Sequence, residues 1–265
     1  MLVKPAFFDK FTCKASACRH TCCAGWEIYV DDDTAARYEK LLDSGEKRLL
    51  ERTPDGILLC REGGRCKFLR GDGLCELIIS HGEEVLCDIC REHPRFYSYS
   101  ENGSVCEAGV GLCCEEAAAL WLSADPEFVR EDDGYDPDSD ELALLGRQTR
   151  LISALLSGEI AIPESDYKRL REIYGRMETL EPLDFPENFS ADLRADERMR
   201  RLMAYYVYRW YFEYPDFALT FAAANALMTL SLGGDFSDAA RRISAEVEYD
   251  PDNTSLVIVG ISGLI

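Results

Sequence analysis

The cysteines of this chain are confined to one stretch of the sequence. The 265 residues include 12 cysteines, and all of them fall between Cys13 and Cys114, so residues 115–265 contain none. A chain of this length can bury an apolar core without cross-links, and its start lacks the pattern of a secretory signal. These features favour thiolate ligation of a metal over a disulfide framework. The distribution therefore predicts a cysteine-rich part followed by a part of ordinary composition.

The spacing of apolar and turn residues predicts a mainly α fold. Residues 1–124 are expected to form a cysteine-rich metal or iron-sulfur cluster domain with short helices, loops and minor β structure, because glycines interrupt most of its apolar runs. Residues 125–140 read as an acidic connector, and residues 141–265 as an α-helical domain. Helical spacing is expected at 140–156, 165–180, 191–214, 217–232 and 237–247.

The last residues, 253–265, are apolar and β-branched, which fits either a terminal strand or a segment packed across the helices.

The charge balance restricts the partners. Acidic side chains outnumber basic ones 49 to 29, giving a net charge of −20, which repels phosphate backbones and argues against nucleic-acid binding. Residues 115–265 carry 14 basic and 30 acidic side chains, a net charge of −16, so a cationic partner is favoured. No stretch of eighteen apolar residues occurs, so no membrane association is expected and the cytoplasm is the expected location.

The first cysteine constellation has the spacing C-x4-C-x3-C-C, formed by Cys13, Cys18, Cys22 and Cys23. Thiolates are soft ligands that suit zinc or an iron-sulfur cluster. A structural zinc site that only ties down the N-terminal loop is the alternative.

The second constellation comprises Cys66, Cys75, Cys87 and Cys90. Cys66 and Cys75 bracket a Gly-Asp-Gly turn, which allows a hairpin to present both thiols on one side. Cys87 and Cys90 have the C-x2-C spacing of metal ligands, although Cys87 is also a candidate for core packing, together with Cys60, Cys106 and Cys113.

Charged residues follow this constellation. Arg91 and Arg95 can stabilise thiolates or bind a cofactor carboxylate, and a surface salt bridge is the alternative interpretation. His81 and His93 are not included among the expected ligands. Cys114 precedes a helix expected to begin at Glu115, where the backbone N–H groups favour an anionic centre.

An aromatic segment stands out in the second half, where Tyr205 and Tyr206 precede Arg209 in the run AYYVYRWYFE. Such a helix can line a pocket for an amine or an adenine ring, but aromatic residues at helical spacing more often belong to a core. The sequence contains no G-x-G-x-x-G after a strand, no Walker loop and no convincing Ser-His-Asp set.

These motifs resemble the flagellin lysine-N-methylase family and a broader group of zinc- or iron-chelating cysteine-cluster proteins. The resemblance begins with P-x-F-x-x-x-F-x-C from Pro5 to Cys13, followed by Cys18 and CCAGW from Cys22 to Trp26. It continues through RCKFL, DGLC, GEEVL, CREHPRF and LCCEEAAAL, and the AYYVYRWYFE run is similar to a helix of that family. It covers most of the chain, with its specificity in the first hundred residues.

The resemblance implies transfer of a methyl group from S-adenosylmethionine to flagellin lysine ε-amines, with a cysteine-bound [4Fe-4S] cluster and zinc as the alternative metal. The first spacing is not the C-x3-C-x2-C of radical S-adenosylmethionine enzymes, which argues against radical cleavage of the cofactor, and polar transfer to a nitrogen needs no radical; both routes stay open. Gly25, Trp26, Arg91 and Arg95 match motif positions and are expected to shape the cofactor pocket. The implied ligands are Cys13, Cys18, Cys22, Cys23, Cys66, Cys75, Cys90 and Cys114.

Methylation of lysine requires a desolvated, deprotonated amine beside the sulfonium, which suits aromatic walls with one or two hydrogen-bond acceptors. Tyr205, Tyr206 and Glu116 are the expected catalytic residues. Two other classes stay open: a non-enzymatic zinc- or iron-binding cysteine-cluster protein with a helical interaction domain, and a methyltransferase that acts on another protein.

Overall fold

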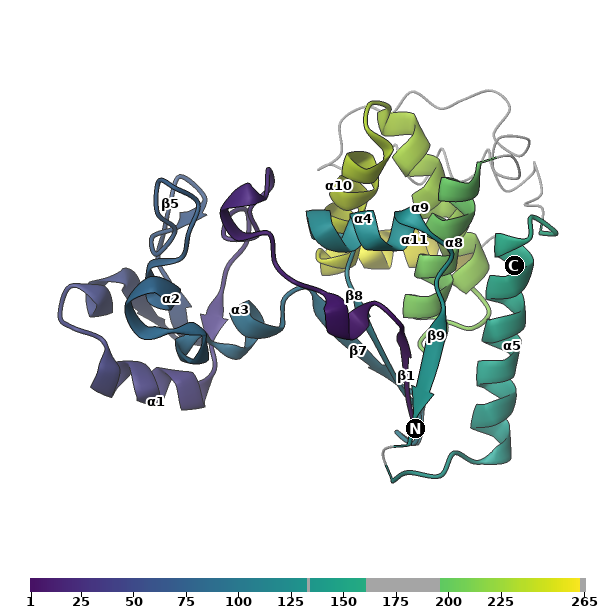
Figure 1. Ribbon diagram of the computed structural model, residues 1–265, viewed down its shortest axis with the longest axis horizontal. Helices are drawn as coiled ribbons and strands as arrows, with labels where there is room; N and C mark the ends of the chain where they lie inside the picture. Colours follow the sequence, from purple (N-terminus) through teal and green to yellow (C-terminus); the bar gives the residue numbers. More distant parts are fainter. Residues whose placement is uncertain (133, 161–195, 263–265) are drawn as a thin grey trace. The chain divides into compact units, whose positions relative to one another are not determined.

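The computed structural model describes residues 1–132, 134–160 and 196–262, without the side chains of residues 261 and 262. The chain forms two compact units (Figure 1). Unit 1 comprises Met1–Phe11 and Pro94–Ile265, and unit 2 comprises Thr12–His93. Unit 2 is therefore inserted into unit 1 between the first strand and the rest of the chain.

A four-stranded sheet with the order β7-β8-β1-β9 joins the two sequence segments of unit 1. β1 (Leu2–Pro5) pairs in parallel with β8 (Cys106–Val110) and antiparallel with β9 (Phe128–Glu131), so the N-terminal strand is internal to the sheet. The edge strand β7 (Arg95–Tyr99) pairs antiparallel with β8, and the ring of Phe96 lies on Gly109. A Cβ atom at Gly109 would come within 2.3 Å of that ring, so this position needs glycine.

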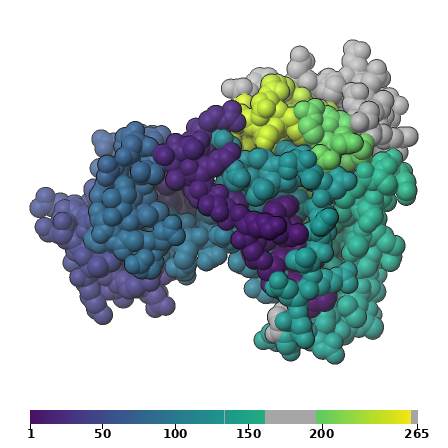
Figure 2. All heavy atoms as spheres, viewed as in Figure 1, coloured from purple at the N-terminus to yellow at the C-terminus, as the bar shows by residue number. Residues whose placement is uncertain are grey.

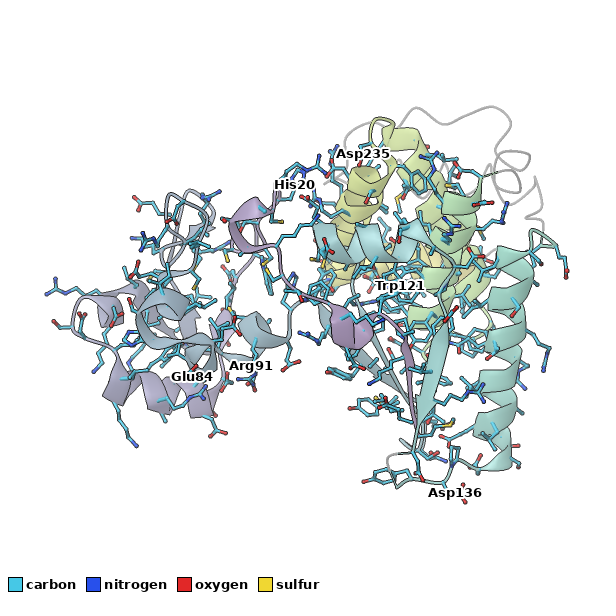
Figure 3. The ribbon with its side chains drawn as sticks, viewed as in Figure 1. His20, Glu84, Arg91, Trp121, Asp136 and Asp235 are labelled. Carbon is cyan, nitrogen blue, oxygen red and sulfur yellow. The ribbon has the colours of Figure 1, made fainter. Side chains whose placement is uncertain are left out.

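The helices of unit 1 pack around α8 (Glu197–Trp210), which contacts α9, α5 and α4. α4 and α10 also lie side by side, as the teal and yellow-green atoms of Figure 2 show. Trp121 of α4 is fully buried within unit 1 (Figure 3). Among the described residues, the other α-helices of the unit are α4 (Glu115–Ser123), α5 (Ser139–Leu156), α9 (Ala218–Leu232), α10 (Phe236–Glu248) and α11 (Pro251–Ser262).

Aspartate side chains begin several of these helices. Asp138, Asp196 and Asp235 each accept a hydrogen bond from a backbone N–H of the first turn of α5, α8 and α10. A carboxylate at this position satisfies amide donors that have no partner within the helix. A short 3-10 helix, η1 (Phe8–Lys10), follows β1 in the same unit.

Unit 2 is built from short elements. Its three-stranded sheet has the order β2-β4-β3, from β2 (Tyr29–Val30), β4 (Gly56–Leu59) and β3 (Leu50–Thr53). A second hairpin pairs β5 (Arg61–Glu62) with β6 (Arg65–Cys66). The helices are η2 (Ala15–Ala17), α1 (Asp32–Leu41), η3 (Glu46–Leu49), α2 (Glu76–His81), η4 (Glu83–Val85) and α3 (Asp88–Glu92).

The predicted fold class is confirmed in part. Helices dominate the described residues after position 138, but the four-stranded sheet of unit 1 is additional β structure that was not predicted. The division also differs from 1–124, 125–140 and 141–265, because β1 pairs with β8 and β9, and β9 lies inside the predicted connector.

Two details concern the C-terminal half. A terminal strand was one of the two alternatives for residues 253–265. This alternative is wrong, since residues 251–262 form α11. The helix expected at 165–180 lies outside the described residues. Within the part of the chain that is described, no helix has the length and apolar character needed to cross a membrane.

Candidate functional site

Backbone pairing brings Cys23 and Cys66 together in unit 2. The N–H of Cys66 donates to the carbonyl of Cys23 at 2.8 Å, and the N–H of Gly25 donates to the carbonyl of Gly64 at 2.9 Å. Gly25 has φ +92°, a left-handed conformation that glycine adopts without strain. The second half of the first cysteine motif therefore runs beside β6.

The Gly-Asp-Gly segment turns the chain between Cys66 and Cys75, as predicted. The N–H of Arg70 donates to the carbonyl of Leu74 at 2.9 Å, and Leu69 forms a β-bridge with Cys75. Cys75 is then the residue that precedes α2. Gly73 lies at this turn with φ +82°, and a Cβ atom there would come within 3.3 Å of the Ser16 backbone. The loop of the first cysteine motif thus lies against this turn.

Asp31 fixes the segment that contains Cys87 and Cys90. One carboxylate oxygen accepts from the N–H of Thr34 at 2.8 Å, which caps α1, and the other accepts from the N–H of Asp88 at 2.9 Å. Asp31 consequently ties the start of α1 to the start of α3, with Cys87 immediately before α3. A hydrogen bond links the Cys87 and Cys90 thiols.

Five thiols pack into or against one small apolar core, in which Cys66 is 7% exposed and Cys87 fully buried. We call them the thiol group: Cys23, Cys66, Cys75, Cys87 and Cys90. Four of them belong to the eight ligands predicted from the resemblance, and Cys87 had been a candidate for packing.

Electrostatic effects connect the members of the thiol group. Burial raises the pKa of Cys66, and the nearby Cys23 and Cys75 add to this shift. Burial likewise raises the pKa of Cys75, with a further contribution from Cys23. Each of these thiols is therefore expensive to ionise alone, which a positive metal ion beside it would reverse.

The pKa values of two members of the thiol group are lowered, which favours their thiolate forms. A hydrogen bond from Cys22 lowers the pKa of Cys23 to about 6. The hydrogen bond with Cys90 lowers the pKa of Cys87, while the same bond, together with burial, raises the pKa of Cys90. Within the group, Cys23 can thus be a thiolate at neutral pH without a metal, while Cys66, Cys75 and Cys90 are held as thiols.

Tyr38 places a hydroxyl at the thiol group. The side chain is 1% exposed, and its hydroxyl has no hydrogen-bond partner among the described residues. Burial raises the pKa of Tyr38, and the Cys87, Cys90 and Cys75 charges raise it further, so the hydroxyl remains a donor. A buried donor without an acceptor costs free energy, and a thiolate- or sulfide-bearing centre would supply one.

The other predicted ligands are not part of this core, although Cys22 hydrogen bonds to Cys23. Cys13 and Cys22 are exposed on the N-terminal loop of unit 2, and Cys18 donates to the carbonyl of His20. Cys114 begins α4 in unit 1, whereas the other seven predicted ligands belong to unit 2. Within residues 1–132, 134–160 and 196–262, no three ligand-type side chains are already arranged as one metal site.

The predicted cofactor-pocket residues have separate partners. Trp26 donates its indole N–H to the carbonyl of Cys22 at 2.5 Å, and its ring lies 5.4 Å from the His93 ring. Burial lowers the pKa of His93 to about 4, so the imidazole is neutral at pH 7.

The two arginines predicted at the cofactor pocket lie in different units. Exposed Arg91 of unit 2, labelled in Figure 3, pairs with Asp88 and Glu92, which is the salt-bridge alternative. Arg95 of unit 1 lies over the rings of Phe11 and Phe8, 5.4 and 5.8 Å from their centroids. Their role in cofactor binding stays a prediction.

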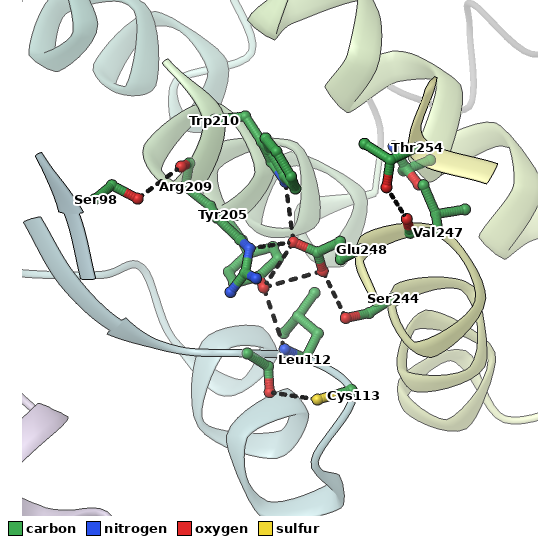
Figure 4. A network of polar contacts seen from close by, with 12 residues as sticks. Ser98, Leu112, Cys113, Tyr205, Arg209, Trp210, Ser244, Val247, Glu248 and Thr254 are labelled. Atoms are coloured by element: carbon green, nitrogen blue, oxygen red, sulfur yellow. Dashed lines mark hydrogen bonds and ion pairs between the residues drawn. The ribbon is translucent and has the colours of Figure 1, made fainter. Parts of the chain in front are cut away.

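A buried charge network lies in unit 1, where α8 and α10 end (Figure 4). Glu248 is fully buried and its Oε1 lies 2.6 Å from the Nε of Arg209. Trp210 donates to Oε1 at 3.0 Å, Ser244 donates to Oε2 at 2.5 Å, and the Tyr205 hydroxyl lies 3.1 Å from both oxygens. Four side chains therefore hold one carboxylate.

The predicted catalytic residues have contrasting environments. Tyr205 and Tyr206 are fully buried, and the Tyr205 hydroxyl also accepts from the N–H of Leu112 at 3.2 Å. Burial raises the pKa of Tyr205 well above its usual value. Glu116 is half-buried in the first turn of α4. The recorded contacts make Tyr205 part of the core, and the catalytic role of all three stays a prediction.

Sequence reasoning missed Glu248, Tyr249 and the contact between Tyr249 and Cys113. Burial raises the pKa of the Cys113 thiol to about 12, and it hydrogen bonds with the Tyr249 hydroxyl. A Cβ atom at Gly111 would come within 2.3 Å of that hydroxyl. One signal was available: an arginine inside an otherwise aromatic helix needs a buried acidic partner.

Three curated proteins are similar to this chain. It is 29% identical over 141 residues to a Lysine-N-methylase of Salmonella typhimurium, covering 48% of this chain and 34% of that protein. It is 28% identical over the same length to a Lysine-N-methylase of Salmonella choleraesuis and to the Flagellar biosynthetic protein FliU of Salmonella muenchen, 80% of which is covered. No family model and no solved structure matches the chain.

Over the matched 141 residues, the chain is therefore similar to proteins named Lysine-N-methylase and to a flagellar biosynthetic protein. The predicted resemblance to the flagellin lysine-N-methylase family is confirmed over the matched part. The match spans about a third of the length of the two Lysine-N-methylases.

Proposed function

We propose that this protein is an S-adenosylmethionine-dependent protein-lysine N-methyltransferase that acts on flagellin and holds a [4Fe-4S] cluster. The similarity to proteins named Lysine-N-methylase carries the proposal. The name of the third relative, a flagellar biosynthetic protein, supports flagellin as the substrate. The net charge of −20 suits a lysine-bearing substrate surface.

We propose Cys23, Cys66, Cys75 and Cys90 as the cluster ligands. They are the predicted ligands that share one small core, and four thiols suffice for one cubane. The donor set fits, because soft thiolates are the ligands of iron-sulfur clusters and the Tyr38 hydroxyl lacks an acceptor. Zinc suits the same thiols and is the alternative metal.

When bound, a thiolate-held cluster supplies an anionic, redox-capable centre. The chain's own thiols and Tyr38 then order the core of unit 2 around it. For the methyl transfer, the neutral lysine amine forms a bond to the methyl carbon while the carbon–sulfur bond breaks and sulfur keeps the electron pair. The alkylated amine then releases a proton. Glu116, which is half-buried, is the proposed acceptor for a lysine proton.

The test combines the oxygen-free protein, flagellin and methyl-labelled S-adenosylmethionine, with labelled lysines identified by mass spectrometry. Label in flagellin lysines, lost in Cys66→Ser and retained in Cys60→Ser, is the expected result. Cys60 is a matched control because it lies in unit 2 outside the thiol group. Label in another lysate protein but not in flagellin would overturn the substrate and retain the reaction.

A second candidate is a non-enzymatic metal-binding protein with a helical interaction domain. The coverage of about a third of the Lysine-N-methylases favours it, since their activity can depend on the unmatched part. Bound metal without methyl incorporation into any protein would select this candidate.

A further inference from the structure

With respect to the described residues, the guanidinium of Arg209 has one occupied edge and one edge without a polar partner. Its Nε pairs with Glu248, and this is the only polar contact of its guanidinium with the described residues. Nη1 is buried and has no hydrogen-bond partner among them. In Figure 4 the terminal nitrogens point away from the Glu248 carboxylate. A guanidinium donates through several N–H groups in a rigid plane, so donors of Arg209 remain for another group.

Glu248 cannot turn to satisfy those donors. Its two oxygens already accept from Arg209, Trp210, Tyr205 and Ser244 at 2.5 to 3.1 Å. The carboxylate is therefore a fixed support that orients the guanidinium through Nε. Such pre-organisation lowers the entropy cost of binding a planar anion at the opposite edge.

Aromatic rings form the surroundings of the guanidinium. Its Cζ lies 4.3 Å from the centroid of Phe96 and 5.4 Å from that of Tyr249. Tyr249 is 42% exposed, while its hydroxyl points inward onto Gly111. The Arg209 side chain itself is 12% exposed. Tyr249 is thus a partly exposed ring beside a largely buried cation, and its ring can also face a second cation.

The charge balance selects the ligand class. Arg209 and Glu248 neutralise each other, so a dianionic phosphate would leave two negative charges in a unit whose residues 115–265 already carry a net charge of −16. A carboxylate matches the guanidinium fork with a single negative charge. A group that carries a positive charge beside that carboxylate leaves no net charge to bury.

We propose that the edge of Arg209 away from Glu248 binds the carboxylate of an α-amino-acid group. Resting on the proposed function, this ligand is the amino-acid end of S-adenosylmethionine, whose sulfonium adds a second positive charge. Arg209 is then a positioning residue that holds the methyl donor through a group remote from the transferred methyl.

Calorimetry on the full chain compares S-adenosylmethionine with its carboxamide, in which the carboxylate is neutral. The wild type is expected to prefer the carboxylate form by roughly tenfold or more, since charge-assisted paired hydrogen bonds are lost in the amide. Arg209→Lys keeps a charge opposite Glu248 but lacks the fork, so the ratio of affinities should fall toward one. Arg201→Lys is the control, because Arg201 lies on the same helix and pairs with Asp125 and Glu197.

A second pair of probes separates this proposal from the proposed function. L-methionine and L-methioninamide are titrated while the indole N–H resonance of Trp210 is followed, since Trp210 contacts Glu248. If S-adenosylmethionine fails to bind but L-methionine is preferred over its amide and Arg209→Lys removes the preference, the carboxylate site stands and the methyl donor is wrong. An unchanged ratio in Arg209→Lys, or no preference for either carboxylate, overturns the proposal.

Discussion

The two units differ in the size of their apolar cores and in the number of thiols at each core. Unit 1 has a large apolar core with one saturated carboxylate, Glu248, held by four side chains. Unit 2 has a small core in which ten residues are buried, two of them cysteines, with further thiols and the Tyr38 hydroxyl beside them. Unit 1 also buries polar atoms without a hydrogen-bond partner among the described residues, including Nη1 of Arg209 and one oxygen of Glu107, so the units differ in the size of the core and in the number of thiols at it.

This difference indicates which of the two units needs a bound metal for its stability. Small cores supply little stability and commonly depend on metals or cross-links. All the cysteines are free in the described structure, and nine of them lie in unit 2. We infer that the fold of unit 2 is coupled to its metal and that of unit 1 is not.

The largest expected effect is metal removal. Structural metal sites contribute on the order of 10 kcal/mol to folding. Stripping the metal should therefore abolish the hydrogen-exchange protection of residues 12–93 and leave that of α4 and β8 intact. Equal protection of unit 2 with and without metal would show that its core is self-sufficient.

The next largest effect is expected from removing the carboxylate that pairs with Arg209 in unit 1. Glu248→Ala leaves Arg209 buried without a counter-charge, which costs about 3–5 kcal/mol. Thermal unfolding should shift to lower temperature, while metal content per chain stays constant. Loss of metal in this variant would mean that the two units depend on each other.

A pH dependence should come from Glu107 of β8, which is fully buried and hydrogen bonded to Gln148 at 3.0 Å. Burial raises the pKa of Glu107 from 4.5 to about 8. The native state then binds more protons than the unfolded state between these values, so stability falls as pH rises from 4.5 to 8, by a few kcal/mol, at roughly 1.4 kcal/mol per pKa unit. Denaturant unfolding of Glu107→Gln should lack this decline; an identical decline would assign it to other groups.

The smallest effect is expected at the surface of unit 2. Arg91 is exposed and its partners Asp88 and Glu92 are also accessible to water. Arg91→Ala should leave the unfolding midpoint unchanged within error and retain the metal. A clear drop in metal content would give Arg91 the role at the thiolates that the sequence also allowed.

Local patterns were predictable from sequence, and long-range pairing was not. Helical spacing predicted α5, α9 and α10, and the Gly-Asp-Gly segment predicted a turn between Cys66 and Cys75, which lie in or against the same small core. The sheet of unit 1 was missed because β1 pairs with strands more than a hundred residues away, which leaves no local signal.

The residues of the candidate site also fall into those that local sequence patterns predicted and those that only the fold revealed. Spacing and resemblance singled out four members of the thiol group, but Cys87 fitted packing equally well by sequence. The role of Tyr38 was not predictable, since nothing in its neighbourhood along the chain reveals that its buried hydroxyl has no acceptor among the described residues. Glu248 lies 39 residues after Arg209, so their pairing also required the fold.

The most direct test of the account is the iron, sulfide and zinc content of the protein purified without oxygen, with its visible spectrum. The wild type and Cys60→Ser should bind a metal stoichiometrically, and Cys66→Ser should lose it. Iron with sulfide and a broad brown absorbance would identify the cluster, and zinc in a colourless protein the alternative metal. A wild-type protein without metal, or a Cys66→Ser variant that retains all of it, would contradict the claim that the thiol group is a metal centre.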